Sequence, residues 1–192
     1  MKHLIRSLFL MVVLALAPVT AGGEELSNLV RQASESISRG SLQEAEAKLE
    51  EALRRISDRL PLRVRKAVFV KGKPRGFGMY TPRGGSMFKT GEPILLYVEP
   101  VHYGLREQEG IREIDLSTDL RIMEPDGKIL FSKEGFARVG LRTRGWNREM
   151  YINLTVTLTG APLGRYILAI RPVDKVTGKT AAFTLPFSIS GG

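Results

Sequence analysis

Hydrophobic and polar residues alternate along most of the C-terminal two thirds of the chain. In residues 150–159 every second side chain is apolar, and threonines occupy much of the other face. Such a period of two places one side of a strand in a core. The segments that show this alternation or a continuous apolar run are 94–98, 116–122, 150–159, 166–170 and 183–189. Short strands with turn signals between them predict an antiparallel β-sandwich of about seven to nine strands over residues 61–190.

The N-terminal third follows a different period. Between residues 24 and 58, apolar side chains recur at helical spacing, and Gly40 interrupts the pattern. Glycine commonly ends a helix, and Ser41 is a suitable first residue for the next one. We predict a helical hairpin over residues 22–60, which makes the fold class α+β.

The predicted hairpin resembles a single tetratricopeptide unit. The residues that match its small and bulky packing positions are Ala33, Gly40, Ala45, Leu49 and Ala52. One such unit cannot bury its own apolar stripe. The resemblance implies packing on the rest of this chain, on a second copy or on another protein, and we predict a docking surface at Leu29, Ala33, Leu49 and Leu53.

Residues 1–21 have the pattern of an export signal. Lys2 and Arg6 precede an apolar run from Leu8 to Ala17, and a small-residue cleavage pattern ends at Ala21. The run is shorter than the roughly 20 apolar residues that span a bilayer. We predict a cleaved signal peptide, a periplasmic or secreted protein, and no integral membrane segment after cleavage. The alternative interpretation is an uncleaved N-terminal anchor.

The residue types exclude several kinds of chemistry. The chain has no cysteine, and His102 is the one histidine outside the predicted signal. Disulfides, zinc–thiolate sites and thiol nucleophiles are therefore absent. Glu99 and His102 are the remaining acid–base candidates, and they are three residues apart on a predicted strand, which favours opposite faces. We predict a protein that is not an enzyme, with no cofactor and no metal site.

Positive charge concentrates in the predicted sandwich. The whole chain has a formal charge of +9, and residues 59–192 hold 22 basic and 12 acidic side chains. Two basic features are candidate ligand sites. The first is a glycine-rich loop with Lys71, Lys73, Arg75 and Arg83, and the second is a strand and its continuation with Arg138, Arg142, Arg144 and Arg148. A solvated loop, and edge charges that discourage strand aggregation, are the alternative interpretations.

A family resemblance covers about 100 residues of the C-terminal region. The segment Phe88–Glu99, the turn Pro125–Lys128 and the stretch from Gly164 to Ile189 resemble an uncharacterised group of exported bacterial proteins. The resemblance implies an immunoglobulin-like sandwich in the periplasm and no known activity. We predict a non-enzymatic binding or scaffolding protein of the bacterial envelope, whose partner is an envelope protein or a second copy. The alternative is a module that binds an anionic glycan, peptidoglycan or lipid phosphate, and nucleic acid is not a predicted partner.

Overall fold

The structure is a computed structural model that describes residues 20–191. The predicted signal segment therefore lies outside the described residues, except for Thr20 and Ala21. The chain divides into two compact units after Arg55. Among the described residues, no helix has the length and apolar character needed to cross a membrane.

The first unit contains the predicted helical hairpin, formed by α1 (Thr20–Ser38) and most of α2 (Leu42–Arg59). Gly40 joins the helices in a left-handed conformation, with φ 77°. The Gly40 amide donates to Ile37 O and the Ser41 amide donates to Ser36 O, so both satisfy carbonyls at the end of α1. The side chains that the hairpin buries are Ala33, Ser36, Ala45 and Ala52. All four are small, which lets the helix backbones approach closely.

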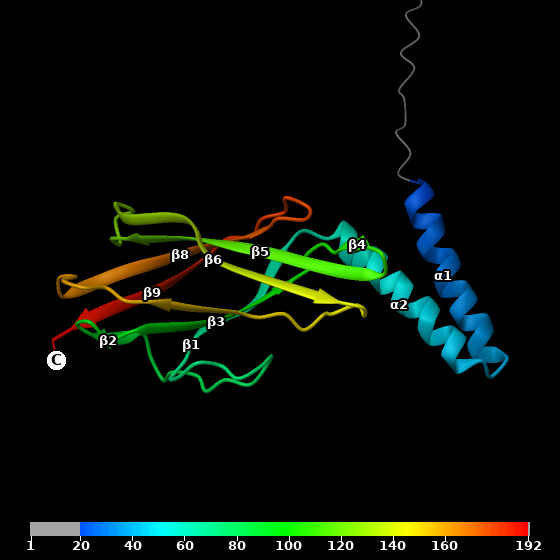
Figure 1. Ribbon diagram of the computed structural model, residues 1–192, viewed down its shortest axis with the longest axis horizontal. Coiled ribbons are helices and arrows are strands. Elements are labelled where there is room, and N and C mark those ends of the chain that lie inside the picture. The colour runs from blue at the N-terminus through cyan, green and yellow to red at the C-terminus, as the bar shows by residue number, and fades with distance from the viewer. Residues whose placement is uncertain (1–19, 192) are drawn as a thin grey trace, which may run out of the picture. The chain divides into compact units, whose positions relative to one another are not determined.

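The second unit contains nine strands in two sheets (Figure 1). Their bounds are β1 (Arg63–Phe69), β2 (Met87–Lys89), β3 (Ile94–Val101), β4 (Arg106–Gln108), β5 (Ile111–Met123), β6 (Ile129–Thr143), β7 (Ile152–Val156), β8 (Gly164–Asp174) and β9 (Phe183–Ser190). The smaller sheet has the order β1-β3-β7. The larger sheet has the order β2-β9-β8-β5-β4. β6 also pairs with β5, along the edge opposite to the one that β8 occupies.

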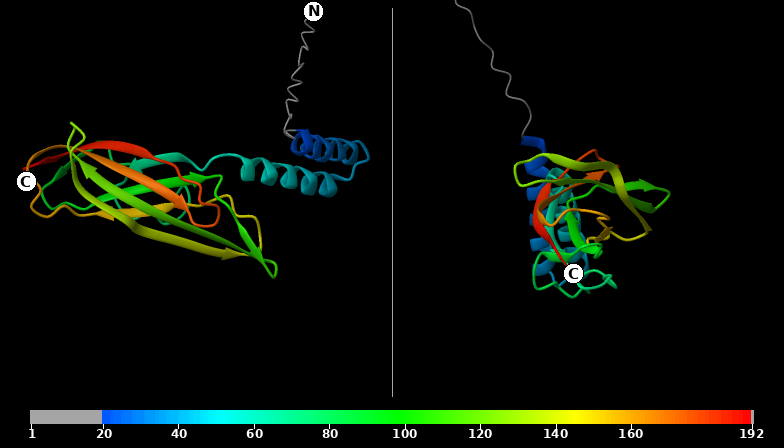
Figure 2. Two further views of the ribbon diagram at one scale, coloured as in Figure 1. Left: turned by 90° about the horizontal axis from the view of Figure 1, so that it is seen from above. Right: turned by 90° about the vertical axis from the view of Figure 1, so that its left-hand side faces the viewer.

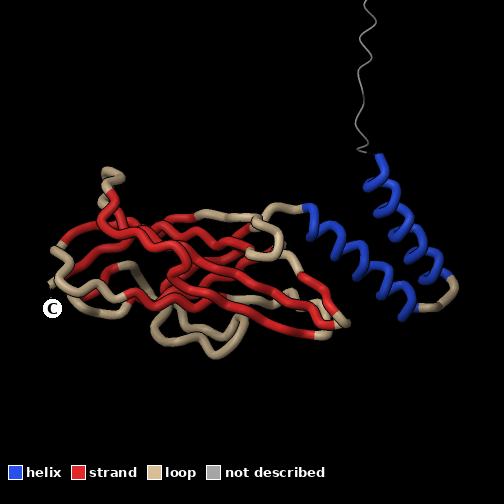
Figure 3. Tube along the Cα trace, turned by 45° about the horizontal axis from the view of Figure 1, so that its top comes forward, coloured by secondary structure: helices blue, strands red, loops and turns tan. Residues whose placement is uncertain are grey.

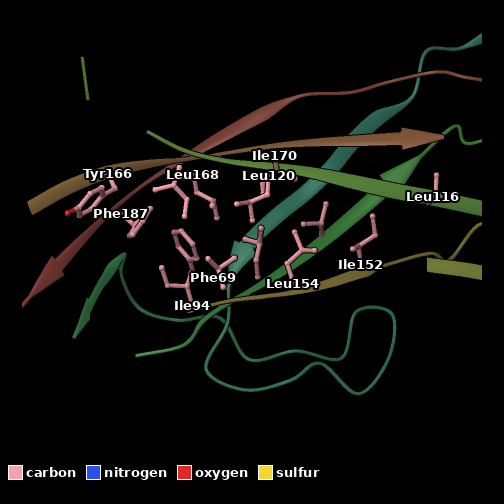
Figure 4. Packing of buried hydrophobic residues seen from close by; sticks show 14 of the residues in the cluster. Phe69, Ile94, Leu116, Leu120, Ile152, Leu154, Tyr166, Leu168, Ile170 and Phe187 are labelled. Atoms are coloured by element: carbon pink, nitrogen blue, oxygen red, sulfur yellow. The ribbon is translucent and has the colours of Figure 1, made fainter. Parts of the chain in front are cut away.

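The two sheets enclose one hydrophobic core, and Figure 2 shows them from two further directions. In the close view, Phe69, Ile94 and Leu154 of the smaller sheet point toward Leu168 and Phe187 of the larger one (Figure 4). Aromatic contacts continue across the layers, since the Phe69 and Phe88 rings meet edge to face at 5.2 Å. Burial of these apolar faces is the main term that favours the fold.

The structure confirms the α+β class, with helices (blue in Figure 3) followed by strands (red). The strands pair mostly antiparallel. The alternation in residues 152–156 is also confirmed, because Ile152, Leu154 and Val156 are buried and the residues between them are exposed. One strand pair differs from the prediction. β2 runs parallel to β9, with Phe88 opposite Ile189, so the larger sheet is mixed.

Candidate functional site

The predicted arginine row on β6 is partly an ion-paired surface. Arg138 and Arg142 lie on one exposed face, as predicted from their spacing. However, Arg138 donates two hydrogen bonds to Asp115 of the neighbouring strand, at 2.8 and 2.5 Å. These bonds lower the pKa of Asp115. Arg142 lies opposite Glu113, and Arg144 is exposed beyond the strand end. The charge of Arg138 is therefore already neutralised within the sheet.

The loop 70–86 between β1 and β2 is fixed to the smaller sheet. The Lys71 amide donates to Thr81 O and the Arg83 amide donates to Phe69 O, so the two ends of the loop pair with each other and with β1. The Arg83 guanidinium contacts Glu92 at 2.6 Å and lies 4.2 Å above the Phe88 ring. Arg83 is therefore a structural residue, while the predicted ligands Lys71, Lys73 and Arg75 stand exposed on the loop.

A buried polar cluster beneath this loop explains its fixed position. The Tyr97 hydroxyl accepts a hydrogen bond from the Gly78 amide and donates one to Glu99 Oε1, both at 2.8 Å. Arg65 Nε donates to the other carboxylate oxygen of Glu99 at 2.9 Å. Burial raises the pKa of Tyr97 to about 12, so its hydroxyl keeps its proton. Tyr80 of the loop stacks on Tyr97 with ring centroids 4.2 Å apart.

The cluster removes Glu99 from acid–base chemistry with His102. Glu99 is 5% exposed, and its carboxylate contacts Tyr97 and Arg65. His102 has a different neighbour, because its Nδ1 lies 3.2 Å from the Ser57 hydroxyl. The structure therefore does not join the two candidates of the sequence through a hydrogen bond. The described residues also contain no group of three or more potential metal ligands.

His102 lies at one end of the β-sheet unit in an unusual conformation. It follows β3 with φ 65°, a left-handed backbone that residues other than glycine seldom adopt. Such conformations cluster at functional sites, where the surrounding structure holds them. The contact with Ser57 ties this residue to the last turn of α2, which belongs to the same compact unit.

Lys179 contacts the same segment from the turn between β8 and β9. Its ammonium donates to Asp58 O at 2.7 Å and to Leu60 O at 2.8 Å, and these carbonyls lie at the C-terminal end of α2. A cation at a helix C-terminus is favoured by the helix dipole. Residues 57–60 thus bring His102 and Lys179, which are far apart in sequence, to one end of the sheets.

Two arginines complete this cationic end, which we define as Arg63, His102, Arg148 and Lys179. Arg63 begins β1 opposite Val101, the residue before His102. Arg148 follows Asn147, whose carbonyl accepts the Tyr103 hydroxyl at 2.9 Å, and its guanidinium lies 4.9 Å from the Trp146 ring centroid.

The electrostatics of the cationic end are unusual. Burial and the positive charges of Arg63, Lys179 and Arg148 lower the pKa of His102. The imidazole is therefore mainly neutral at pH 7, since its ordinary pKa is about 6.5. Among carboxylates of the area, Asp174 is buried and accepts hydrogen bonds from Gly104 N and from the Val176 and Thr177 amides. Burial is the main cause that raises the pKa of the neighbouring Tyr103 phenol to about 12, and the charge of Glu149 adds to it.

The sequence singled out Arg148 and His102 for separate reasons, but it identified neither Arg63 nor Lys179 as a candidate and did not bring the four residues together. Lys179 follows Gly178 in a short polar turn of the sequence. No local pattern shows that its ammonium lies against carbonyls of residues 58 and 60. The signal that could have drawn attention to this region is the polar turn 174–180, which contains Gly178, at the end of a predicted strand.

The predicted docking residues of the hairpin have different environments. Leu49 and Leu53 are exposed, at 41% and 43%, whereas Ala33 is 1% exposed and packs inside the hairpin. Ala33 is therefore wrong as a contact residue, because a small side chain there serves close helix packing. Leu29 is half-buried.

Comparisons with known proteins assign no family. No family model and no curated protein matches this chain. One similar solved structure is the Pseudomonas fluorescens alkylpurine DNA glycosylase AlkC bound to DNA containing an abasic site analogue. It is 11% identical with a TM-score of 0.39, over 88% of this chain and 38% of the glycosylase. Another is the CARDB domain of the PF1109 protein from Pyrococcus furiosus in complex with di-metal ions, 13% identical with a TM-score of 0.30, over 68% of this chain and 86% of that one.

The comparison contradicts the predicted envelope scaffold. The first of these structures is a DNA-bound glycosylase, and an envelope scaffolding role finds no support among the matches. That role, with the docking function it gave the helical hairpin, is therefore not retained. At these identities and TM-scores no activity or ligand is transferred from either protein to this chain.

Proposed function

We propose that this chain is a binding protein that holds an oxyanion, a phosphate or carboxylate group, at the cationic end. The observation that carries the proposal is that Arg63, opposite the residue before His102, lies at the same end of the sheets as His102 and Lys179, which both contact residues 57–60. Gathering like charges is unfavourable unless a counter-charge binds. A bound oxyanion supplies that counter-charge.

The four side chains of the cationic end would contribute to oxyanion binding in different ways. Arg63 and Arg148 each present a planar guanidinium that can hold two oxygens of one anion. Lys179 contributes charge and one remaining N–H, because two of its protons are directed at the carbonyls of Asp58 and Leu60. His102 gains a proton when the anion arrives, because a negative charge raises its pKa. Binding is therefore expected to take up protons near neutral pH.

We also propose that the sheets have an immunoglobulin-like arrangement. The order β1-β3-β7 corresponds to strands A, B and E, and the order β9-β8-β5-β6 corresponds to G, F, C and C′. In this assignment, His102 belongs to the B–C connection and Lys179 to the F–G connection. In immunoglobulin variable domains, these two connections lie at the ligand-binding end. The proposed fold and the proposed site therefore agree.

The experiment is an NMR titration of the full chain with inorganic phosphate, followed at the His102 ring protons. His102→Gln identifies the signal and separates it from that of His3. We expect phosphate to raise the His102 pKa, with Arg63→Gln or Arg148→Gln weakening binding about tenfold each. Lys71→Gln removes the same charge from the exposed loop and is the matched control. A parallel titration with citrate distinguishes carboxylate from phosphate.

Two results decide against the proposal. The first is a His102 pKa that stays constant across the phosphate and citrate titrations. The second is equal weakening by Lys71→Gln and Arg63→Gln, because this would show general attraction to a basic protein and no defined site. A shift of the His102 signal that saturates, and that the two arginine variants reduce, supports the proposal.

We further propose that the protein is exported through residues 1–21. The positive start and short apolar run of the sequence support this. N-terminal sequencing of the protein purified from its native cells tests it, with Gly22 as the expected first residue. Retention of Lys2 in that protein would be inconsistent with a cleaved signal.

A further inference from the structure

The larger sheet extends one strand beyond the smaller sheet at the β6 edge. In the antiparallel pair β5–β6, Phe131 lies opposite Ile122 and Lys133 lies opposite Leu120. Directly opposed residues share a face, and Ile122 and Leu120 face the core. Phe131 and Lys133 therefore point to the core side of β6. Both are nevertheless exposed, Phe131 by 44%, because β7 ends the smaller sheet before it covers them.

An apolar groove of about 550 Å³ lies at this open edge. Its walls come from the end of β7 and the following residues on one side, and from β6 and β8 on the other. The side chains that give it apolar character are Phe131, Phe136, Val156, Leu158 and Tyr166.

Two irregularities in β6 shape the groove. The register between β5 and β6 shifts between Thr118 and Leu120, and again between Ile122 and Met123. At the first shift, Gly135 adopts a left-handed conformation with φ 58°, and its amide donates to Asp119 Oδ1 at 2.8 Å. Such bulges re-aim side chains. Here the bulge turns Phe136 back to the core side, where it packs against the hydrophobic cluster.

The edge of β7 offers the backbone pairing that an occupant needs. β7 pairs with β3 on one side and, within residues 20–191, with no strand on the other. Outward N–H and C=O groups of an edge strand are a template for another extended chain. A strand added there would direct alternate side chains into the groove, which is the known geometry of strand addition.

Charge selects the chemistry of the occupant. Lys133 is exposed on the core side of β6, two residues along the strand from Phe131 of the groove wall, and no salt bridge to it occurs in the described part of the chain. A strand added to β7 would lie over the core side of β6 and take the Lys133 ammonium out of water, which is unfavourable unless a counter-charge pairs with it. A carboxylate on the incoming strand removes that penalty, so Lys133 favours an acidic partner over a neutral one.

We propose that an extended segment of a partner polypeptide adds to the free edge of β7 as a fourth strand, with alternate apolar side chains in the groove and an acidic side chain at Lys133. In the immunoglobulin-like assignment this is the place of strand D, which follows E in the order ABED. The inference rests on the groove and the β7 edge, and it does not depend on the anion site at the opposite end.

The test uses synthetic peptides and the full chain. The probe is a short fluorescent peptide in which valine alternates with threonine and one central valine is replaced by glutamate. A second peptide carries lysine at that position. We expect the glutamate peptide to bind in a fluorescence anisotropy titration and to protect the β7 amides in hydrogen exchange. Lys133→Glu should weaken the glutamate peptide about tenfold and strengthen the lysine peptide.

Lys71→Glu is the matched control, since it reverses a charge on the exposed loop 70–86. Equal effects of Lys71→Glu and Lys133→Glu would overturn the proposal, as would peptide binding that leaves the β7 amides unprotected. Failure of both peptides to bind would also overturn it. Light scattering tests whether a second copy of this chain occupies the groove. A dimer that excludes the glutamate peptide would show that a second copy fills the groove, and the proposal would then be wrong.

Discussion

Replacing Tyr97 with phenylalanine isolates the hydroxyl that connects the loop 70–86 to the smaller sheet. The Tyr97 ring stacks on Tyr80 at 4.2 Å and on Tyr151 at 5.7 Å, and a phenyl ring keeps both contacts. The substitution therefore removes two hydrogen bonds, one from the Gly78 amide and one to the Glu99 carboxylate. It leaves the packing of the ring unchanged.

The two bonds differ in strength. A neutral hydrogen bond contributes about 0.5–1.5 kcal/mol, and one to a charged group contributes about 1.5–3 kcal/mol. The Glu99 carboxylate keeps its bond from Arg65, so it is not left without a partner. The Gly78 amide lies on the exposed loop and can bond to water after a small movement. We therefore expect Tyr97→Phe to lower the free energy of unfolding by about 2–4 kcal/mol.

Urea unfolding measured by tryptophan fluorescence reports this loss. Trp146 is the one tryptophan of the chain and lies in the β-sheet unit, so its emission follows that unit. Hydrogen exchange at the Gly78 amide gives the local readout, and faster exchange is expected. Tyr151→Phe is the control, because Tyr151 stacks on the same ring and its hydroxyl has no hydrogen bond among those of the described residues. Equal midpoints for the two variants would refute the reasoning.

Three further predictions concern other residues of the β-sheet unit. Thr118→Val should raise the free energy of unfolding by about 1 kcal/mol, measured as a higher urea midpoint, because the Thr118 hydroxyl is buried without a partner in the described chain. Gly104→Ala should lower the free energy of unfolding by about 1–3 kcal/mol, measured as a lower melting temperature, because the added Cβ would overlap the Thr177 side chain. The free energy of unfolding should fall as the pH drops from about 6.5 to the lowered pKa of His102, because the unfolded chain binds this proton at a higher pH than the folded chain does. His102→Gln should flatten this pH dependence, measured by urea unfolding at several pH values.

The sequence predicted the elements of the core well, because burial there follows a simple period. Leu116, Leu120 and Leu168 are all inward, as their spacing requires. It was less informative for β6, which begins at Ile129 and contains two register shifts. The exposed apolar run Ile129–Phe131 interrupts the alternation there. A bulge depends on the partner strand, and no local pattern in β6 alone specifies it.

The candidate site was largely hidden from the sequence. Arg138 has the spacing of a ligand-binding row, but its pairing with Asp115 depends on the register between β5 and β6. The glycines of the loop 70–86 suggested a solvated loop, whereas the Gly78 amide binds the Tyr97 hydroxyl from a strand 19 residues later. Contacts between distant segments set these outcomes, and composition alone gives no information on them.

The parallel pairing of β2 with β9 has a consequence for how the unit folds. Ser190 Oγ donates to Phe88 O, a contact between residues 102 positions apart. Closing a loop of that length costs about 4 kcal/mol of chain entropy before any contact in it is gained. The β8–β9 hairpin spans a much shorter turn, so we expect it to form first and β2 to join last. Refolding of this unit should accordingly take milliseconds to seconds, the range of domains dominated by long-range pairing.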